Sequence, residues 1–237
     1  MSTPGFQATA ERGASGVKER VKRLAHLALE PLTALLARLG IGPDAVTFMG
    51  LLVSLTAALA FFEGYFPLGA LLVAISGICD LIDGELARRS GIRSRFGAFL
   101  DSTLDRLSDG MVLAGIAGFY LVHLTELVLE PSQAMVEIAR GLEPRTWAVV
   151  SLTAVLAMLG SFMVSYTRAR AEGLGLECRV GWFERPERMV LIIVAGAFGV
   201  GRVMSFALIL MAVLSFSTAI QRVVHIWKLT RGAGLDS

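Results

Sequence analysis

Six apolar segments, separated by short polar ones, fill most of the chain after residue 45. They cover residues 46–62, 68–87, 97–122, 147–166, 189–201 and 203–220. A helix that crosses a bilayer needs about 20 consecutive, largely apolar residues, and most of the six approach that length. The segment 189–201 is shorter and needs the polar flank around Arg188 as its first turn. The pattern predicts an all-α integral membrane bundle of six transmembrane helices.

The chain before these segments changes from polar to amphipathic. Residues 1–16 lack the basic and then apolar order of a secretory signal, which predicts a disordered cytoplasmic tail. In residues 17–40, apolar side chains recur at steps of three and four beside clustered Lys and Arg. This favours an amphipathic juxtamembrane helix over the alternative of two helices in a soluble core. Pro31 suits the first turn of a new helix and Gly40 its end, so two pieces are expected to meet near Glu30. The six-helix domain then spans residues 41–230, and residues 231–237 form a second cytoplasmic tail.

Composition and charge support this assignment. Of the 237 residues, 54% are hydrophobic and 18% charged, with a mean hydropathy of +0.65. Such a chain has too few polar side chains to cover a water-soluble globule, and its net charge of +2 creates no field that would attract nucleic acid. With a cytoplasmic N-terminus, only Arg140, Arg145 and Arg202 of the 22 basic residues face outward. The positive-inside rule therefore predicts a multi-pass protein of the cell (inner) membrane with both termini cytoplasmic.

Four carboxylates interrupt the second and third apolar segments. Two lie three residues apart on one helix and two lie four apart on the next, so each pair shares a helix face, and a short basic loop brings the faces together. Unit charges ~4 Å apart repel by about 4 kcal/mol at an effective dielectric of 20, which favours shared protons or bound divalent cations. Oxygen ligands select Mg²⁺ or Mn²⁺. The alternative is a structural network with Arg88 and Arg106, but four carboxylates exceed what two arginines can satisfy. The four residues are Asp80, Asp83, Asp101 and Asp105.

These aspartates belong to a longer pattern, D-x2-D-G-x2-A-R-x8-G-x3-D-x3-D. Its fixed positions are Asp80, Asp83, Gly84, Ala87, Arg88, Gly97, Asp101 and Asp105. The pattern resembles the signature of the CDP-alcohol phosphotransferase family, and the resemblance covers residues 32–228. It implies six spans, a cytoplasmic site and an interfacial N-terminal helix. It also implies transfer of a phosphatidyl-type group from a CDP-linked donor to an alcohol, with release of CMP.

The resemblance further implies a role for individual residues. The four aspartates hold two divalent cations, and Asp105 is also the base. That role is chemically sensible, because an alcohol is a poor nucleophile unless a carboxylate takes its proton. Asp109, one turn deeper, is expected to be a structural hydrogen-bond acceptor. By the same resemblance, the donor's cytidine diphosphate contacts Asp44, Ala45, Val46, Thr47, Gly84, Arg88 and Ser94.

Basic residues near the ends of the later spans bear on the acceptor alcohol. Residues 165–172 and 183–188 resemble the inositol-phosphate-using branch of the family and its archaeal-lipid relatives. In that branch, basic residues at the positions of Arg168, Arg188 and Arg222 hold the acceptor's phosphate. The first position is commonly Lys in the bacterial enzymes and is Arg here, which leaves the particular sugar phosphate open. Arg185 is equally well explained as a positive-inside flank. The expected reaction is transfer from CDP-diacylglycerol to a phosphorylated polyol, with inositol phosphate as the first candidate.

Several alternatives remain at this stage. The acceptor could be glycerol phosphate or serine, or the donor could carry an archaeal-type lipid. An aspartate-rich membrane prenyltransferase also binds a magnesium pyrophosphate, but its two acidic motifs lie far apart, whereas all four acids here fall within 26 residues. A cation transporter is disfavoured because the acids lie at the end of the spans and no internal repeat is evident. The resemblance also favours a homodimer. Small residues at Gly110, Ala114 and Gly118 would permit close helix approach, within the chain or across that dimer.

Overall fold

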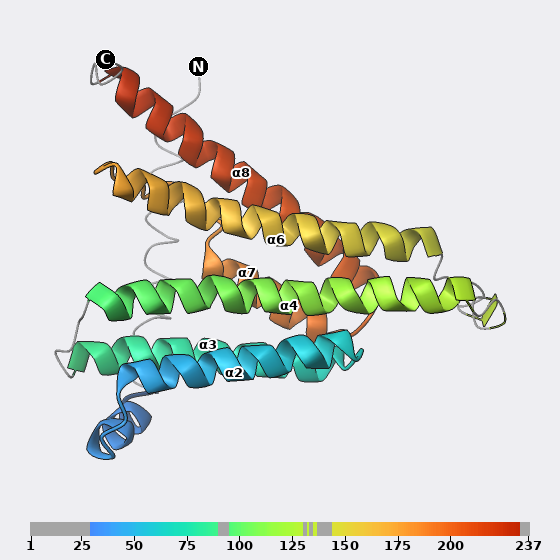
Figure 1. Cartoon of the computed structure of the whole chain (residues 1–237), viewed down its shortest axis with the longest axis horizontal. Helices are drawn as coiled ribbons and strands as arrows, with labels where there is room; N and C mark the ends of the chain where they lie inside the picture. The colour runs from blue at the N-terminus through green and yellow to red at the C-terminus, as the bar shows by residue number, and fades with distance from the viewer. Residues whose placement is uncertain (1–28, 90–94, 130–131, 133–134, 137–143, 233–237) are drawn as a thin grey trace, which may run out of the picture.

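The structure, a computed structural model, describes residues 29–89, 95–129, 132, 135–136 and 144–232 (Figure 1). All regular secondary structure in those residues is helical, which confirms the all-α prediction. A short helix over residues 29–38 precedes the main bundle. The bundle consists of α2 (Pro43–Phe62), α3 (Phe66–Arg89), α4 (Arg95–Leu129), α6 (Pro144–Gly173), α7 (Arg185–Ala197) and α8 (Arg202–Gly232).

Five of these helices are long and apolar enough to cross a membrane: α2, α3, α4, α6 and α8. The sixth predicted span corresponds to α7, whose 13 residues extend about 20 Å at 1.5 Å per residue. As expected from its polar flank, α7 begins at Arg185 and has Arg188 in its first turn. Glu184 caps it, because the side chains of Glu184 and Glu187 each accept a backbone N–H from the other residue. The helix ends at Ala197, short of the predicted boundary at residue 201.

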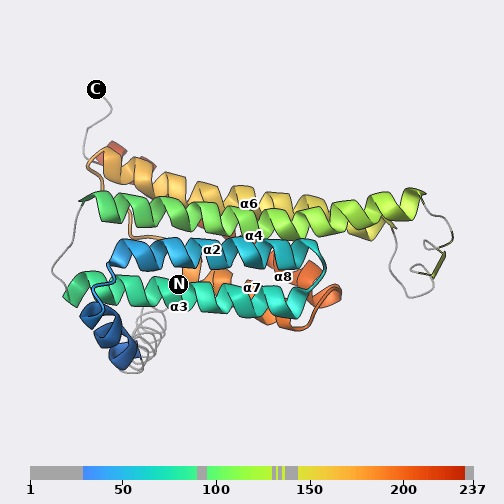
Figure 2. The same cartoon turned by 60° about the horizontal axis from the view of Figure 1, so that its bottom comes forward.

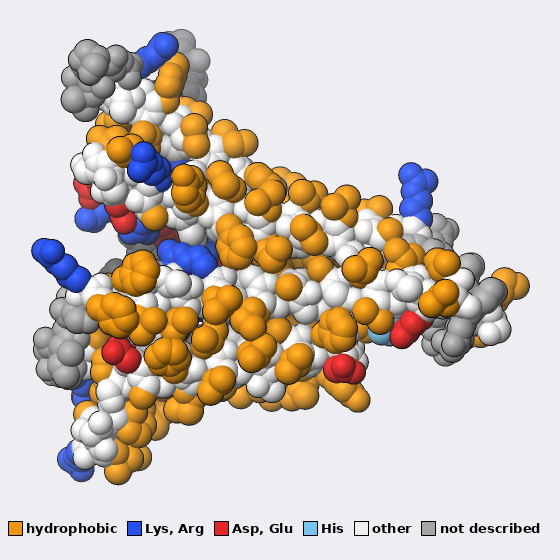
Figure 3. Space-filling model, viewed as in Figure 1, with side chains coloured by type: hydrophobic (Ala, Val, Ile, Leu, Met, Phe, Trp, Pro, Cys, Tyr) orange, Lys and Arg blue, Asp and Glu red, His pale blue; other side chains and the backbone are white. Residues whose placement is uncertain are grey.

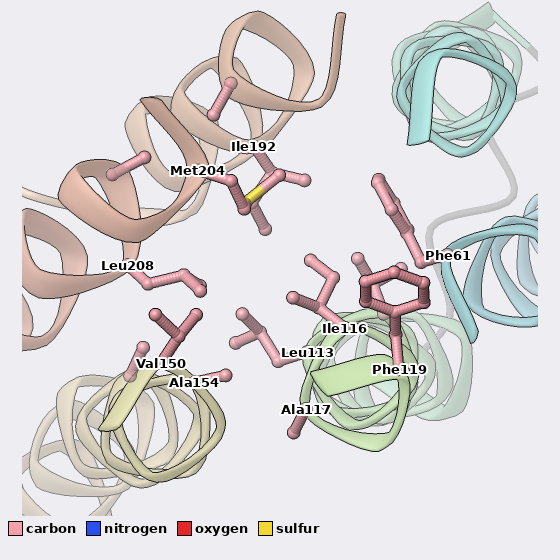
Figure 4. Close-up of a cluster of buried hydrophobic side chains, with 14 of the residues drawn as sticks. Phe61, Leu113, Ile116, Ala117, Phe119, Val150, Ala154, Ile192, Met204 and Leu208 are labelled. Carbon is pink, nitrogen blue, oxygen red and sulfur yellow. The ribbon is translucent and has the colours of Figure 1, made fainter. Parts of the chain in front are cut away.

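The six helices pack as a closed ring in the order α3, α2, α4, α6, α8, α7 and back to α3 (Figures 1 and 2). Apolar side chains fill the centre of the ring. Phe61, Leu113, Ile116, Met204 and Leu208 converge there from α2, α4 and α8 with at most 1% of their surface exposed (Figure 4). Apolar side chains cover most of the face of the bundle seen in Figure 3, as expected for a surface in contact with lipid.

The N-terminal helix ends where the sequence predicted. Gly40 adopts a φ of 71°. The N–H of Ile41 donates to the carbonyl of Leu36, and the N–H of Gly40 donates to the carbonyl of Ala37. This is the glycine-terminated Schellman arrangement. Figure 2 shows the helix at a steep angle to the bundle. The predicted tail 1–16, residues 17–28 of the juxtamembrane helix and residues 233–237 of the second tail lie outside the described residues.

Small residues on α4 are used for packing within the chain. A Cβ atom on Gly110 would lie 2.7 Å from the Phe162 ring of α6, and one on Gly118 would lie 2.8 Å from the Phe62 ring of α2. Ala114, between them, is exposed. Two of the three positions in the predicted stripe therefore accommodate rings of this same chain.

Among the described glycines, Gly115 has the closest neighbour, because an added Cβ would lie 2.2 Å from the backbone oxygen of Ala58 on α2. Gly115→Ala is expected to force α2 and α4 apart at a cost of ~1–3 kcal/mol. The midpoint of thermal unfolding in detergent should fall by about 2–4 °C per kcal/mol. Gly173→Ala is the matched control, because nothing lies within 4 Å of that position. Equal midpoints for the two variants would contradict the close contact.

Candidate active site

The candidate site lies at the end of the bundle where α3 ends and α4 begins, and basic side chains gather at this end in Figure 3. Asp80 on α3 meets Asp101 and Asp105 on α4, and one carboxylate oxygen from each lies within 4.8 Å of the others. Within the described chain, Oδ1 of Asp101 is buried and has no hydrogen-bond partner. Three of the four predicted metal ligands are therefore brought together. Three converging carboxylates, one of which carries a buried oxygen without a partner, fit a hard divalent cation such as Mg²⁺ or Mn²⁺.

Asp83, the fourth predicted ligand, lies beside this group and is not part of it. Its side chain is buried, and its Oδ2 accepts a hydrogen bond of 2.8 Å from the hydroxyl of Thr47 on α2. A small cavity of about 10 Å³ is lined by Thr47, Asp83, Asp80 and Asp105, among others. The predicted donor-contacting segment at the start of α2 thus adjoins the predicted metal ligands.

Five further predicted donor-contacting residues are described by the structure: Asp44, Ala45, Val46, Gly84 and Arg88. Asp44 and Ala45 are exposed, whereas Val46 is buried. Nothing lies within 4 Å of the place where a Cβ of Gly84 would be, so this glycine leaves open space beside Asp83. Arg88 forms an ion pair of 2.7 Å with Glu85. Ser94 lies outside the described residues.

Two arginines of α7 neutralise the carboxylates. Nη1 of Arg185 lies 2.9 Å from Asp80 Oδ2 and 3.0 Å from Asp105 Oδ1, and its Nε lies 3.4 Å from Asp109 Oδ1. Nη2 of Arg188 lies 2.9 Å from Asp109 Oδ2. Asp109 is thus the hydrogen-bond acceptor that the sequence predicted. From the sequence, Arg185 was equally well explained as a positive-inside flank, although its spacing of three from Arg188 places the two on one helix face.

The three predicted acceptor-binding arginines line one cavity of about 160 Å³. Arg168 comes from α6, Arg188 from α7 and Arg222 from α8, and Asp105 forms part of the same wall. Arg188 is 4% exposed, and its Nε and Nη1 have no hydrogen-bond partner within the described residues. Buried donors without partners are energetically unfavourable. An anion in this cavity would lie beside the Arg188 guanidinium.

Arg222 has a structural role in addition to lining this cavity. Its Nε donates to the carbonyl of Val180 at 2.9 Å, its Nη1 to that of Val164 at 2.5 Å, and its Nη2 to Glu184 at 3.1 Å. Glu184 Oε1 also lies 3.6 Å from Nη1 of Arg168. Glu184 therefore connects α6, α8 and the start of α7, a role that the sequence analysis missed. The capping-box spacing of Glu184 and Glu187 was the available signal.

Comparison with known proteins places these features in a family. The sequence profile of the CDP-alcohol phosphatidyltransferase family matches residues 41–229. Archaetidylinositol phosphate synthase of Methanothermobacter thermautotrophicus is 37% identical over 194 residues, which cover 81% of this chain and 86% of the relative. Phosphatidylinositol phosphate synthase of Streptomyces avermitilis is 34% identical over 237 residues, covering 95% and 88%.

Solved structures are similar as well. Phosphatidylinositol phosphate synthase of Mycobacterium tuberculosis with CDP-DAG bound has a TM-score of 0.69 at 31% identity, covering 83% of this chain and 92% of that one. The same enzyme in complex with manganese and citrate has a TM-score of 0.67. The matched profile includes all the aspartates and arginines described above, and the chain therefore belongs to the CDP-alcohol phosphatidyltransferase family.

Proposed function

We propose that this protein transfers a phosphatidyl group from CDP-diacylglycerol to a hydroxyl of inositol phosphate, giving phosphatidylinositol phosphate and CMP. The observation that carries the proposal is the position of Asp105. Its carboxylate belongs to the three-aspartate group and also lines the arginine cavity. One side chain thus stands between a site suited to a metal-bound diphosphate and a site suited to an anionic alcohol.

Side chains of this protein take the proton of the acceptor hydroxyl and orient both substrates. An acceptor hydroxyl beside Asp105 gives its proton to that carboxylate as its oxygen bonds to the phosphorus that carries the diacylglycerol. The bond from that phosphorus to the bridging oxygen breaks, and CMP leaves with the electron pair. Two divalent cations held by Asp80, Asp83, Asp101 and Asp105 would neutralise the charge that develops on the diphosphate. The open side of Gly84 and the start of α2 provide room for the nucleotide.

The acceptor is the better supported of the two substrates. The names of the archaeal and the bacterial relatives share inositol phosphate and differ in the lipid. A donor with an archaeal-type lipid is accordingly the second candidate, favoured by the 37% identity to the archaeal enzyme. The arginine cavity supports a phosphorylated acceptor in both cases. A phosphate on the acceptor adds about two negative charges close to carboxylates that repel it. Its binding therefore needs cationic side chains away from the metals.

Arg188→Ala and Arg222→Ala are expected to raise the KM for inositol phosphate at least tenfold, because each removes a guanidinium from the cavity wall. The affinity for the CDP-linked donor should change little. Steady-state kinetics with each substrate varied in turn measures both effects. Arg179→Ala is the control, since Arg179 is 83% exposed and pairs with Glu177. Arg222→Ala also removes two bonds to backbone carbonyls, so its unfolding midpoint is measured alongside.

Free inositol serves as the matched substrate control for the same prediction. It lacks the phosphate that the arginines would hold, and is expected to be a poor acceptor. If free inositol or serine reacts as well as inositol phosphate, or if the alanine variants weaken donor and acceptor equally, the phosphate-binding assignment fails. The wider family assignment would be unaffected by that result.

We further propose that α7 is the sixth span, that the site and both termini are cytoplasmic, and that the juxtamembrane helix lies on the inner-membrane surface. The position of α7 within the ring, packed against α3 and α8, supports its inclusion among the spans. The basic residues around the site support the orientation through the positive-inside rule. We also propose that the protein forms the homodimer that the family resemblance implies.

A further inference from the structure

One cation lies directly at the predicted metal ligands. Nη1 of Arg185 is shared by Asp80 of α3 and Asp105 of α4, at 2.9 Å and 3.0 Å. The side chain is 17% exposed, and among the described residues it is the cation within ion-pair distance of both carboxylates. Arg185 therefore supplies positive charge at two of the carboxylates that the proposed function assigns to a divalent ion.

A divalent ion bound to the two oxygens that Arg185 contacts would compete with the guanidinium for them. Mg²⁺ and its analogues bind carboxylate oxygens at about 2.0–2.1 Å. An ion bound to the same two oxygens would lie close to Nη1. The two positive charges would then repel each other strongly, because water screens charges weakly at this partly buried site. The Arg185 guanidinium must then leave when the metal arrives.

The same side chain has a place to go. Arg185 also lines the arginine cavity, and its Nε is already within 3.4 Å of Asp109, a second member of that cavity wall. Because Arg185 is the first residue of α7, no preceding helical turn restricts its side chain. Rotation of its side-chain bonds can carry the guanidinium from Asp80 to the cavity while Asp109 remains a partner.

We infer that Arg185 is the resident counter-ion of the metal-binding carboxylates in the metal-free protein, and that metal binding transfers its guanidinium to the arginine cavity. The inference rests on the proposed function for the identity of the metal ligands. The transferred charge strengthens anion binding in the cavity, so metal and phosphate each raise the affinity for the other. Arg185 thereby acts as a positioning residue that couples the two halves of the site.

The test uses the purified full-length protein in detergent, without a CDP-linked donor. Mn²⁺ affinity is measured by electron paramagnetic resonance of free Mn²⁺, with and without saturating inorganic phosphate, and corrected for Mn²⁺–phosphate complexes in buffer. In the unmodified protein, phosphate is expected to tighten Mn²⁺ binding at least fivefold. In Arg185→Ala, Mn²⁺ is expected to bind more tightly without phosphate, and phosphate to change the affinity less than twofold. Arg185→Lys, which retains a charge, should restore part of the coupling, and Arg179→Ala should keep all of it.

A second readout covers the metal-free state. Without Arg185 the carboxylates lose their counter-ion, so Mn²⁺ should raise the thermal unfolding midpoint of Arg185→Ala more than that of the unmodified protein. The inference is overturned if phosphate tightens Mn²⁺ binding equally in both proteins, or if their midpoints rise equally. Failure of the unmodified protein to bind Mn²⁺ at all would contradict the proposed function itself, and the inference with it.

Discussion

Asp80→Asn and Asp101→Asn are each expected to lower the rate of CMP release by about a thousandfold or more. A metal ion contributes several kcal/mol of charge stabilisation to such a transfer, and 1.36 kcal/mol corresponds to a tenfold change in rate. Both residues belong to the three-aspartate group, and Asp101 also carries a buried oxygen without a partner in the described chain. An amide retains one oxygen but loses the negative charge that holds the ion.

Metal removal tests the same site without changing the chain. Activity of the unmodified protein is expected to vanish in excess chelator and to return with Mg²⁺ or Mn²⁺. Glu126→Gln is the matched substitution, because Glu126 lies on α4 near its far end and is largely exposed. It should retain the original activity and metal dependence. Full activity in excess chelator would rule out a metal-dependent mechanism.

Asp105→Asn is expected to reduce kcat by about 10²–10⁴-fold, which is the usual contribution of a general base. The amide keeps the size of the side chain and can still accept a hydrogen bond from Arg185, but it cannot take the proton of the alcohol. Donor affinity, measured by titration with CDP in the presence of Mn²⁺, should be largely retained. A loss in kcat with donor binding preserved would show that Asp105 contributes more to the chemical step than to holding the metal and the donor.

Asp109→Asn provides the comparison one helical turn away. Asp109 is bound by Arg185 and Arg188 and lies outside the three-aspartate group. Its substitution is expected to raise the acceptor KM more than it lowers kcat, because it positions arginines and takes no proton. Near-normal turnover by Asp105→Asn, together with a collapse of kcat in Asp109→Asn, would assign the base to Asp109.

Part of the candidate site's geometry could be predicted from the sequence, because membrane helices restrict where charged residues can lie. The spacing of Asp101 and Asp105 places them on one face of α4, and the short connection to α3 brings Asp80 to that face. The arginines at 168, 188 and 222 converge because the ends of neighbouring spans lie at similar depth. The first relation depends on helix periodicity and the second on span length, and both can be read from the chain. The choice of these three arginines among the basic residues came from the family resemblance.

Details that depend on helix rotation and loop conformation could not be predicted in this way. Side chains three residues apart on a helix point in directions about 60° apart. Asp80 therefore meets carboxylates of α4, whereas Asp83 accepts a hydrogen bond from α2. Arg222 is tied to carbonyls of Val164 and Val180, and the second of these belongs to the segment between α6 and α7, whose path no local pattern specifies. The contact of Arg185 with two carboxylates likewise follows from how α7 packs against α3.

The central claim is transfer from CDP-diacylglycerol to inositol phosphate, and CMP release tests it most directly. Purified protein in detergent with CDP-diacylglycerol and Mg²⁺ receives inositol phosphate, free inositol, glycerol phosphate or serine in separate reactions. The account predicts rapid CMP release with inositol phosphate, together with a product that carries both the lipid and the inositol phosphate. Equal release with all four alcohols, or none with inositol phosphate while another alcohol reacts, would contradict it.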